Sequence, residues 1–483
     1  MRGAAVRLSD ISRRGLMRAA LLASCVVGAA YGADADGVIV LKAARIHTVA
    51  GETLENGAIV IEGGRITAVG PDVPIPEGAR VMEHVDGVIT PGLIDACCLI
   101  DSEIPQEARS WSYGAPPRSF WGALGEYARR QRDEPDPECD PIEDTARTLP
   151  DGLAAALPPQ ITWTEQSAEV TPHRRVLDSL NLFSNDFTRL ARAGVTTVYV
   201  SADTANVIGN RGAIVKTAGP LAERVIRGVD AVKVTLGGDP TLRGTANLLP
   251  PSHGPAPSFL TRRPTTRMGV DWVFRKAFYD AQRVRAGLAI HGADMPPTEA
   301  VPVLLQVLDG EVPLRVQARM QHDIFSALRL AGEFKLKFTL EEATEAYRCL
   351  PQLKAAGVPV IFGPLYMTPT GFRAATDEVD RARLNTPAQL ADAGIEFALT
   401  AQELRDEEGL VRQGMVAVRH GLTPELALRA MTATPASFMG LAGEVGVIAP
   451  RAAADVVVWS GEPFDAASRP VLVLVSGRVV YKD

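Results

Sequence analysis

The strongest constraint on the fold is an apolar run at residues 88–100, whose polar members are Thr90 and Asp95. A strand that is apolar on both faces is typical of a parallel sheet covered by helices. Pro91-Gly92 favours a corner at the entrance to this strand. In a barrel of such strands, chemistry is found at the carboxyl ends. We therefore predict a buried barrel strand here, with the residues just past it facing the barrel mouth.

Short strands are expected near both ends of the chain. Residues 38–41, 44–46, 58–61 and 65–69 have strand patterns, and Glu62-Gly63-Gly64 favours a tight hairpin between the last two. Residues 454–459, 471–475 and 477–481 have the same character. A small β unit is therefore predicted from these terminal segments.

Strand and helix patterns alternate in the middle of the chain, which favours a βα barrel. The predicted helices include residues 187–193, 267–285 and 323–334, and the predicted strands are residues 194–200, 213–216, 231–236, 314–318, 337–342, 359–363 and 395–400. Residues 101–182 are instead rich in proline, arginine and acidic residues, with little periodicity. They are predicted to be an elaborated loop over the barrel mouth or partly disordered.

The amino terminus has the pattern of an export signal. Paired arginines at residues 13–14 precede a short apolar stretch and small residues near Ala33, which resembles a twin-arginine signal peptide covering residues 1–33. A membrane anchor is the alternative, but the stretch is shorter than the roughly 20 residues needed to span a bilayer. A lipoprotein box ending at Cys25 is a further alternative. We expect an exported, periplasmic or extracytoplasmic protein without a transmembrane segment.

Composition excludes two other classes. A net charge of -7 with scattered basic residues gives no electrostatic footprint for nucleic acid, so no such partner is expected. Four cysteines remain beyond Cys25, too few in 483 residues for a disulfide framework. Adjacent Cys97 and Cys98 seldom bond to each other, and Cys98 is predicted to be a small buried residue.

Two motifs resemble the amidohydrolase superfamily, most closely its imidazolonepropionase-like branch. The first is Pro91-Gly92-Leu93-Ile94-Asp95-Ala96, and the second runs from Gly446-Val447-Ile448-Ala449-Pro450 to Asp455-Val456-Val457. The family usually has Gly-Lys after that proline, where this chain has Arg451-Ala452. The resemblance covers nearly everything after the signal except about residues 101–160.

The resemblance implies an α/β fold with a (β/α)8 TIM-type barrel. Residues 34–88 and 446–483 are then expected to form a composite β-sandwich, residues 89–445 the barrel, and residues 101–182 a loop-rich insertion. Members of the family hydrolyse carbon–nitrogen bonds with one or two divalent metals, usually zinc. The metal lowers the pKa of bound water to about 7, so that hydroxide attacks a carbonyl carbon.

The family's metal ligands are altered in this chain. Carried over by the resemblance, the five positions fall on Cys97, Leu99, Gln317, Glu342 and Gln402. Leucine does not bind metal and a glutamine amide is an uncharged, poor ligand, which leaves Cys97 and Glu342 as weak candidates. Gln402 also lacks the carboxylate that would act as base. No bound metal is expected.

Other residues do not restore the metal site at the level of sequence. The seven histidines show no HxH or HExxH spacing and are expected to be ordinary polar or capping residues: His47, His84, His173, His253, His291, His322 and His420. Lys216 ends a strand, where some amidohydrolases carry a carboxylated lysine; a lysine paired with an acidic neighbour is favoured. Glu342 is similarly expected to pair with an arginine such as Arg319.

The sequence therefore predicts a catalytically inactive amidohydrolase relative. It would bind a small molecule at the barrel mouth or act as the inert partner of an active paralogue, and homo-oligomers are common in the family. One alternative is a hydrolase with a rebuilt Cys97/Glu342 site, although a cysteine in a strand is more often buried and inert. Another is a structural or interaction protein whose mouth is filled by the long loop.

Overall fold

The computed structural model describes residues 37–100, 168–202, 204–242, 264–290, 296–365 and 381–483. The predicted signal peptide and most of the segment at residues 101–182 lie outside these ranges. Within them, the fold is a mixed α/β fold with three sheets. No described helix combines the length and the apolar character needed to cross a bilayer.

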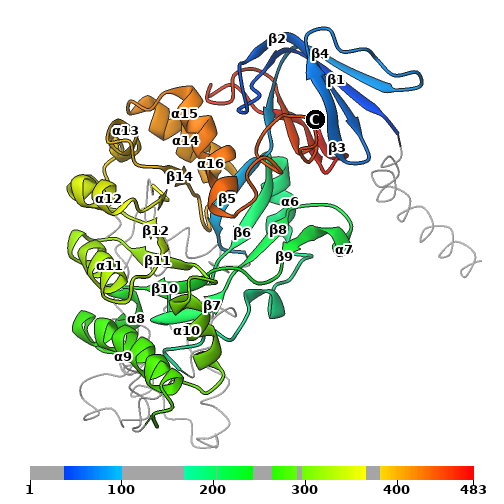
Figure 1. The fold of residues 1–483 in the computed structure, drawn as a ribbon. Coiled ribbons are helices and arrows are strands. Elements are labelled where there is room, and N and C mark those ends of the chain that lie inside the picture. Colours follow the sequence, from blue (N-terminus) through cyan, green and yellow to red (C-terminus); the bar gives the residue numbers. More distant parts are fainter. Residues whose placement is uncertain (1–36, 101–167, 203, 243–263, 291–295, 366–380) are drawn as a thin grey trace, which may run out of the picture.

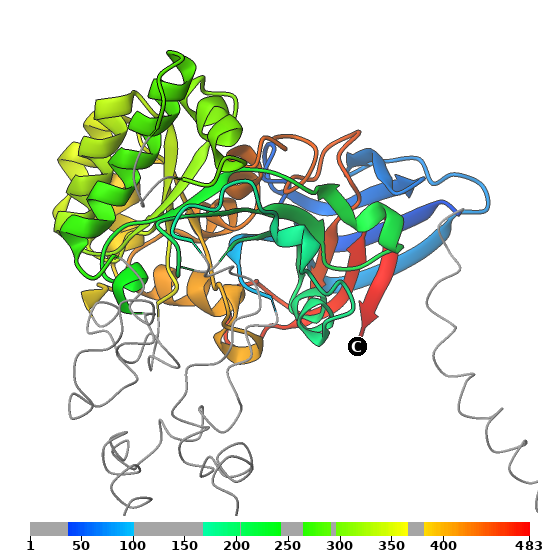
Figure 2. The same cartoon turned by 90° about the horizontal axis from the view of Figure 1, so that it is seen from below.

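The two ends of the chain build one seven-stranded sheet, in the order β17-β16-β15-β4-β1-β2-β3. Its strands are β1 (Ile39–Ile46), β2 (Leu54–Glu62), β3 (Arg65–Gly70), β4 (Arg80–Pro91), β15 (Val456–Trp459), β16 (Pro470–Val475) and β17 (Arg478–Lys482). β4 lies in the middle, parallel to β1 and antiparallel to β15. Figure 2 shows the blue amino-terminal and red carboxy-terminal strands lying together. The predicted pairing of the two terminal segments is therefore present, as one sheet.

The hairpin between β2 and β3 follows the prediction. Gly63 and Gly64 both have positive φ, 56° and 77°, which two-residue hairpin turns of type I′ require. The strands pair antiparallel with Glu62 opposite Arg65. Buried isoleucines from both strands contribute to the apolar cluster of this sheet.

The apolar run at residues 88–100 is two strands, which corrects the prediction of one barrel strand. β4 ends at Pro91 in the seven-stranded sheet, and β5 (Leu93–Cys98) begins a different sheet. Gly92 lies at the corner, where its backbone N–H donates to the Asp455 carbonyl at 2.8 Å. A Cβ at this position would lie 2.2 Å from Thr196 Oγ1. Only glycine fits this corner without displacing the neighbouring strand.

The central strands form two sheets. The six-stranded sheet has the order β14-β13-β12-β11-β10-β7, and the four-stranded sheet has the order β5-β6-β8-β9. Their remaining strands are β6 (Val195–Val200), β7 (Ile208–Arg211), β8 (Ala213–Lys216), β9 (Val225–Arg227), β10 (Val232–Thr235), β11 (Leu314–Ala318), β12 (Phe338–Glu342), β13 (Val360–Phe362) and β14 (Phe397–Leu399). Strands β10 to β14 are parallel.

A closed eight-stranded parallel barrel is not formed by the described strands, which corrects the predicted fold in part. β7 pairs antiparallel with β10, and β8 pairs antiparallel with β6, so the chain changes sheets at Gly212. On the other side, β5 and β14 belong to different sheets. The antiparallel β7 and β8 cannot continue the parallel ladder, and this interrupts the regular order.

Helices cover the outer side of the six-stranded sheet, as Figure 1 shows for α9, α11, α12 and α13. The helices are α6 (Asn185–Arg192), α7 (Leu221–Arg224), α8 (Asp239–Leu242), α9 (Arg267–Arg285), α10 (Ala300–Leu308), α11 (Gln321–Phe334), α12 (Leu350–Ala356), α13 (Thr386–Asp392), α14 (Leu410–Arg419), α15 (Pro424–Ala430) and α16 (Ala433–Phe438). Phe274 and Phe278 of α9 pack against Phe334 of α11. The predicted helix at residues 267–285 is confirmed.

Candidate functional site

The candidate site lies at the carboxyl ends of β5, β10, β11, β12 and β14. Asp95 of β5 joins two of these ends, because its carboxylate accepts from Thr400 Oγ1 at 2.6 Å and from the N–H groups of Cys97 and Ala401, both at 3.0 Å. Burial raises the pKa of Asp95, and these donors only partly oppose that effect. Asp95 thus fixes the end of β5 against the residues that follow β14.

Three of the five positions predicted from the sequence meet directly. Gln402 Nε2 donates to Glu342 Oε1 at 3.2 Å and lies 3.8 Å from Cys97 Sγ. Gln317, oriented with its amide oxygen toward Arg319, accepts from that guanidinium at 3.2 Å. Leu99 joins through its backbone, since its N–H donates to the Gln402 carbonyl at 3.3 Å.

Cys97 is a buried, protonated thiol. Its side chain belongs to a small apolar cluster with Ala96, Ile361 and Ala398. Burial is the largest cause that raises its pKa well above the usual value for a thiol, and the charge of Glu341 acts in the same direction. A nucleophilic cysteine requires a lowered pKa and an accessible sulfur. The surroundings of Cys97 provide neither.

Glu342 is held by an arginine, as the sequence predicted. Arg319 Nε donates to Glu342 Oε2, and its two terminal nitrogens bind Asp239 at 2.5 and 2.7 Å. All three side chains are buried. Burial raises the pKa of Asp239, but Arg319 outweighs that effect and the pKa is lowered. Asp239 is therefore an ionised partner of the guanidinium, which also binds Glu342.

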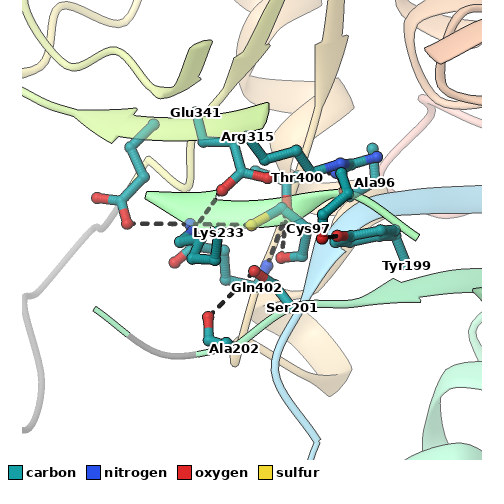
Figure 3. Close-up of polar contacts among 12 residues, drawn as sticks. Ala96, Cys97, Tyr199, Ser201, Ala202, Lys233, Arg315, Glu341, Thr400 and Gln402 are labelled. Carbon is teal, nitrogen blue, oxygen red and sulfur yellow. Dashed lines mark hydrogen bonds and ion pairs between the residues drawn. The ribbon is translucent and has the colours of Figure 1, made fainter. Parts of the chain in front are cut away.

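A second group of buried charges lies beside Cys97 on β10, β11 and β12. Lys233 Nζ donates to one oxygen of Glu341, and Arg315 Nη1 lies 3.2 Å from the other (Figure 3). Arg315 also donates to the Ala96 carbonyl, and its guanidinium stacks 3.4 Å from the centre of the Tyr199 ring. Burial lowers the pKa of Lys233, yet Glu341 outweighs it and the pKa is raised.

The sequence analysis missed Lys233, Arg315, Glu341 and Asp239. Lys233 and Arg315 are each flanked by apolar residues within short buried strands, and Glu341 follows Leu340. A charge inside a strand that is buried on both faces needs a partner, and this signal would have found Lys233, Arg315 and Glu341. Asp239 lies at the start of α8, where the sequence gives no such signal. With Arg319 and Glu342, the six side chains comprise three cations and three carboxylates, so their formal charges cancel.

Backbone strain occurs at two of the predicted site positions. Glu342 has a φ of 66° and Gln402 a φ of 51°, both in the left-handed region that non-glycine residues seldom adopt. Each such residue costs on the order of 1–3 kcal/mol and persists only where the surroundings enforce it. The ion pair to Arg319 and the hydrogen bond between the two side chains supply that restraint here.

Lys216 and the described histidines lie apart from this group. Lys216 forms a buried ion pair with Asp455, which confirms the prediction of an acidic partner. His322 lies in the first turn of α11, where Nε2 is 3.3 Å from Asp323. His47 contacts Glu462 on the seven-stranded sheet. His253 and His291 lie outside the described residues.

Comparisons with known proteins bear on the family. An amidohydrolase family profile matches residues 393–481. Amidohydrolase tasK of Hapsidospora irregularis is 22% identical over 342 residues, which cover 66% of this chain and 34% of tasK. A crystallised amidohydrolase from Thermotoga maritima MSB8 is 24% identical, with a TM-score of 0.70 over 92% of this chain and 100% of that chain.

Together these comparisons support the resemblance to the amidohydrolase superfamily. The imidazolonepropionase-like branch is consistent with the family profile. A further crystallised amidohydrolase is 16% identical, with a TM-score of 0.50 over 92% of this chain and 99% of that chain. At these identities the likeness to the solved structures shows the fold alone. The chain spans about a third of the length of tasK, so the activity of that protein is not transferred to it.

Proposed function

We propose that this amidohydrolase-superfamily protein is catalytically inactive and acts as a binding or scaffold protein, such as the inert partner of an active paralogue. The observation that carries the proposal is the buried ion-pair network at the strand ends. At the proposed ligand positions, the one carboxylate, Glu342, is bound by Arg319, and Gln402 supplies an amide in place of a base.

The donor set does not fit a divalent metal. A metal ligand must offer a deprotonated thiol, a neutral imidazole or a free carboxylate. Here the Cys97 thiol has a raised pKa, and Lys233 and Arg315 bring two positive charges to its side. Glu341 balances one of these charges, so a dication beside the three side chains would meet one excess positive charge and be repelled, at an energy that grows as the dielectric constant falls. We therefore propose that the cations of the chain take the place of the family's metals.

The alternative of a rebuilt hydrolase receives no support from the contacts. The sulfur of Cys97 contacts the Gln402 amide, which does not remove a proton from a thiol. Lys233 and Arg315 lie beside it with raised pKa values, so both are protonated and neither acts as a base. Glu342 is engaged by Arg319 and Gln402, so it does not offer a free base to the sulfur. Covalent catalysis needs a nucleophile within reach of an activating base.

The finer features of the fold and location are also proposals. We infer that the two central sheets represent an interrupted (β/α)8 barrel. On one side, the chain passes directly from β7 in one sheet to β8 in the other. On the other side, the Leu99 N–H donates to the Gln402 carbonyl between the ends of β5 and β14. Residues 34–88 and 446–483 would form the separate composite β domain. Residues 1–33 would direct export. A small molecule bound at the barrel mouth remains part of the same proposal.

Elemental analysis tests the proposal. The mature protein, purified without chelator, is analysed for zinc, iron, manganese and nickel, and again after incubation with excess zinc and desalting. We expect metal contents far below one per chain and no hydrolysis across a panel of cyclic and linear amides. A Cys97→Ala/Glu342→Gln variant is the matched control. Stoichiometric metal that this variant loses, or turnover that it abolishes, would overturn the inactive assignment.

A further inference from the structure

An open cavity of about 590 Å³ lies beside the first turn of α11, on the carboxyl side of β11 and β12. Its walls come from the start of α11, from Glu345 and Arg348 around the 3-10 turn η4 (Ala346–Arg348), and from Arg381. Figure 1 shows α11 among the helices that cover the six-stranded sheet. None of the five positions carried over from the family lines this cavity, so a ligand here would not occupy the candidate site.

Two arginines present accessible guanidinium nitrogens to the cavity. Arg348 uses its Nε, which lies 3.2 Å from the Tyr347 hydroxyl and 3.3 Å from Glu345 Oε1. Its two terminal nitrogens donate to no described residue, and 46% of its side chain is exposed. Arg381 is also exposed, and within the described part of the chain it forms neither a hydrogen bond nor an ion pair. Both arginines therefore have donors left for a ligand.

Tyr347 holds the two arginines on the same cavity. The guanidinium of Arg383 lies 4.2 Å from the centre of the Tyr347 ring, and the hydroxyl of the same ring accepts from Arg348. A cation over an aromatic face is attracted by the ring electrons. The segment that contains Arg381 is therefore fixed beside η4, and Arg348 and Arg381 line one space.

The lining has an excess of positive charge. Glu345 is its carboxylate, and this side chain is buried. Both of its oxygens are engaged, because Oε2 accepts from the Gln321 N–H at 2.8 Å and Oε1 faces Arg348. Two arginines against one glutamate leave one formal positive charge, and His322 adds no negative charge to the wall. The cavity therefore favours an anion with a single charge.

Apolar side chains complete the wall. Met320 and the half-buried Phe325 lie on the α11 side of the cavity. A carboxylate matches the fork of a guanidinium, and a hydrocarbon group on the same molecule would contact these two side chains. We propose that this cavity binds a monoanionic carboxylate that carries an apolar group, such as an arylalkanoic acid. The proposal holds whether or not the chain hydrolyses amides.

Titration of the full chain with 3-phenylpropionate, followed by calorimetry and by ligand-observed NMR, tests this proposal. 3-Phenylpropanamide lacks the charge and propionate lacks the ring, so each should bind at least about tenfold more weakly. An absence of 3-phenylpropionate binding at millimolar concentration would overturn the proposal. Equal binding of the amide would show that the arginines play no part, and equal binding of propionate would show the same for the apolar wall.

Two variants locate the site. Arg381→Gln and Arg348→Gln should each weaken 3-phenylpropionate binding about tenfold or more. Arg381 has no contact with the described residues to lose, so Arg381→Gln should unfold in urea like the parent. Arg412→Gln on α14 is the matched control, since Arg412 is likewise exposed and forms no ion pair in the described ranges. The control should bind like the parent.

Unchanged binding by both cavity variants would place the ligand elsewhere and refute the assignment. These measurements involve neither metal content nor amide turnover. A failure here is therefore distinct from a failure of the proposed inactive role.

Discussion

Arg319→Met is the substitution that tests the buried network most directly. It removes the guanidinium that holds both Asp239 and Glu342. Breaking a buried ion pair costs about 3–5 kcal/mol, because a charge remains without its partner. Asp239 loses two hydrogen bonds at once, while Glu342 keeps the Gln402 amide at 3.2 Å. We expect the free energy of unfolding to fall by about 4 kcal/mol at neutral pH.

The loss of stability in Arg319→Met should depend on pH, and the pKa of Asp239 sets the direction of that dependence. In the parent, the pKa of Asp239 is lowered, so its stabilisation is present above the unfolded value of about 3.9 and is lost only at more acid pH. Without Arg319, burial raises that pKa above the unfolded value, and the folded state then binds the additional proton. The difference in free energy of unfolding between the parent and the variant should therefore shrink as the pH falls from neutral toward 5. The change should be up to about 1.4 kcal/mol per pH unit for each additional proton that the folded variant binds.

Urea unfolding followed by tryptophan fluorescence and circular dichroism, at several pH values, measures both effects. The triple variant Arg319→Met/Asp239→Asn/Glu342→Gln should recover a large part of the loss, since no charge is left unpaired. Arg175→Met removes an exposed arginine from its pair with Asp178 and should change stability by less than about 1 kcal/mol. If Arg319→Met lowers the free energy of unfolding by less than about 1 kcal/mol, or by an amount independent of pH, Arg319 does not neutralise buried carboxylates as argued.

Two further predictions concern Gly92, at the corner before β5, and the thiol of Cys97 within β5. Gly92→Ala should destabilise the fold by about 1–3 kcal/mol or more, because its Cβ would lie 2.2 Å from Thr196 Oγ1, and Gly92→Ala/Thr196→Ala should restore part of the loss in the same urea assay. Equal stability of Gly92→Ala and the parent would contradict the close approach. Cys97 should resist iodoacetamide at pH 8 in the native state, as judged by peptide mass spectrometry, and react after unfolding, because burial raises the pKa of its thiol. Rapid native labelling of Cys97 would show an accessible thiolate and reopen the hydrolase alternative.

Local patterns in the sequence were sufficient for many elements. The helix at residues 267–285, the hairpin at Gly63-Gly64 and the buried strands β10 to β14 all follow from short-range periodicity and turn residues. The motif around Pro91-Gly92 indicated the family. The pairing of Glu342 with Arg319 could also be predicted, because a buried carboxylate requires a partner.

Contacts between distant segments could not be derived in the same way. The run at residues 88–100 gives no local signal that β4 and β5 belong to different sheets; the fit of Gly92 against Thr196 and Asp455 decides it. The periodicity of β7 and β8 does not reveal that both strands run antiparallel to their neighbours. Register and direction depend on which strands meet in space.

The sequence by itself predicted, through the family resemblance, that Leu99 and Gln402 stand at ligand positions where neither side chain would bind a metal well. Tertiary structure decided which charges meet beside these positions, by bringing Lys233, Arg315 and Glu341 together from three strands. Side-chain identity is local information, whereas the pairing of buried charges depends on distances between residues far apart in the chain.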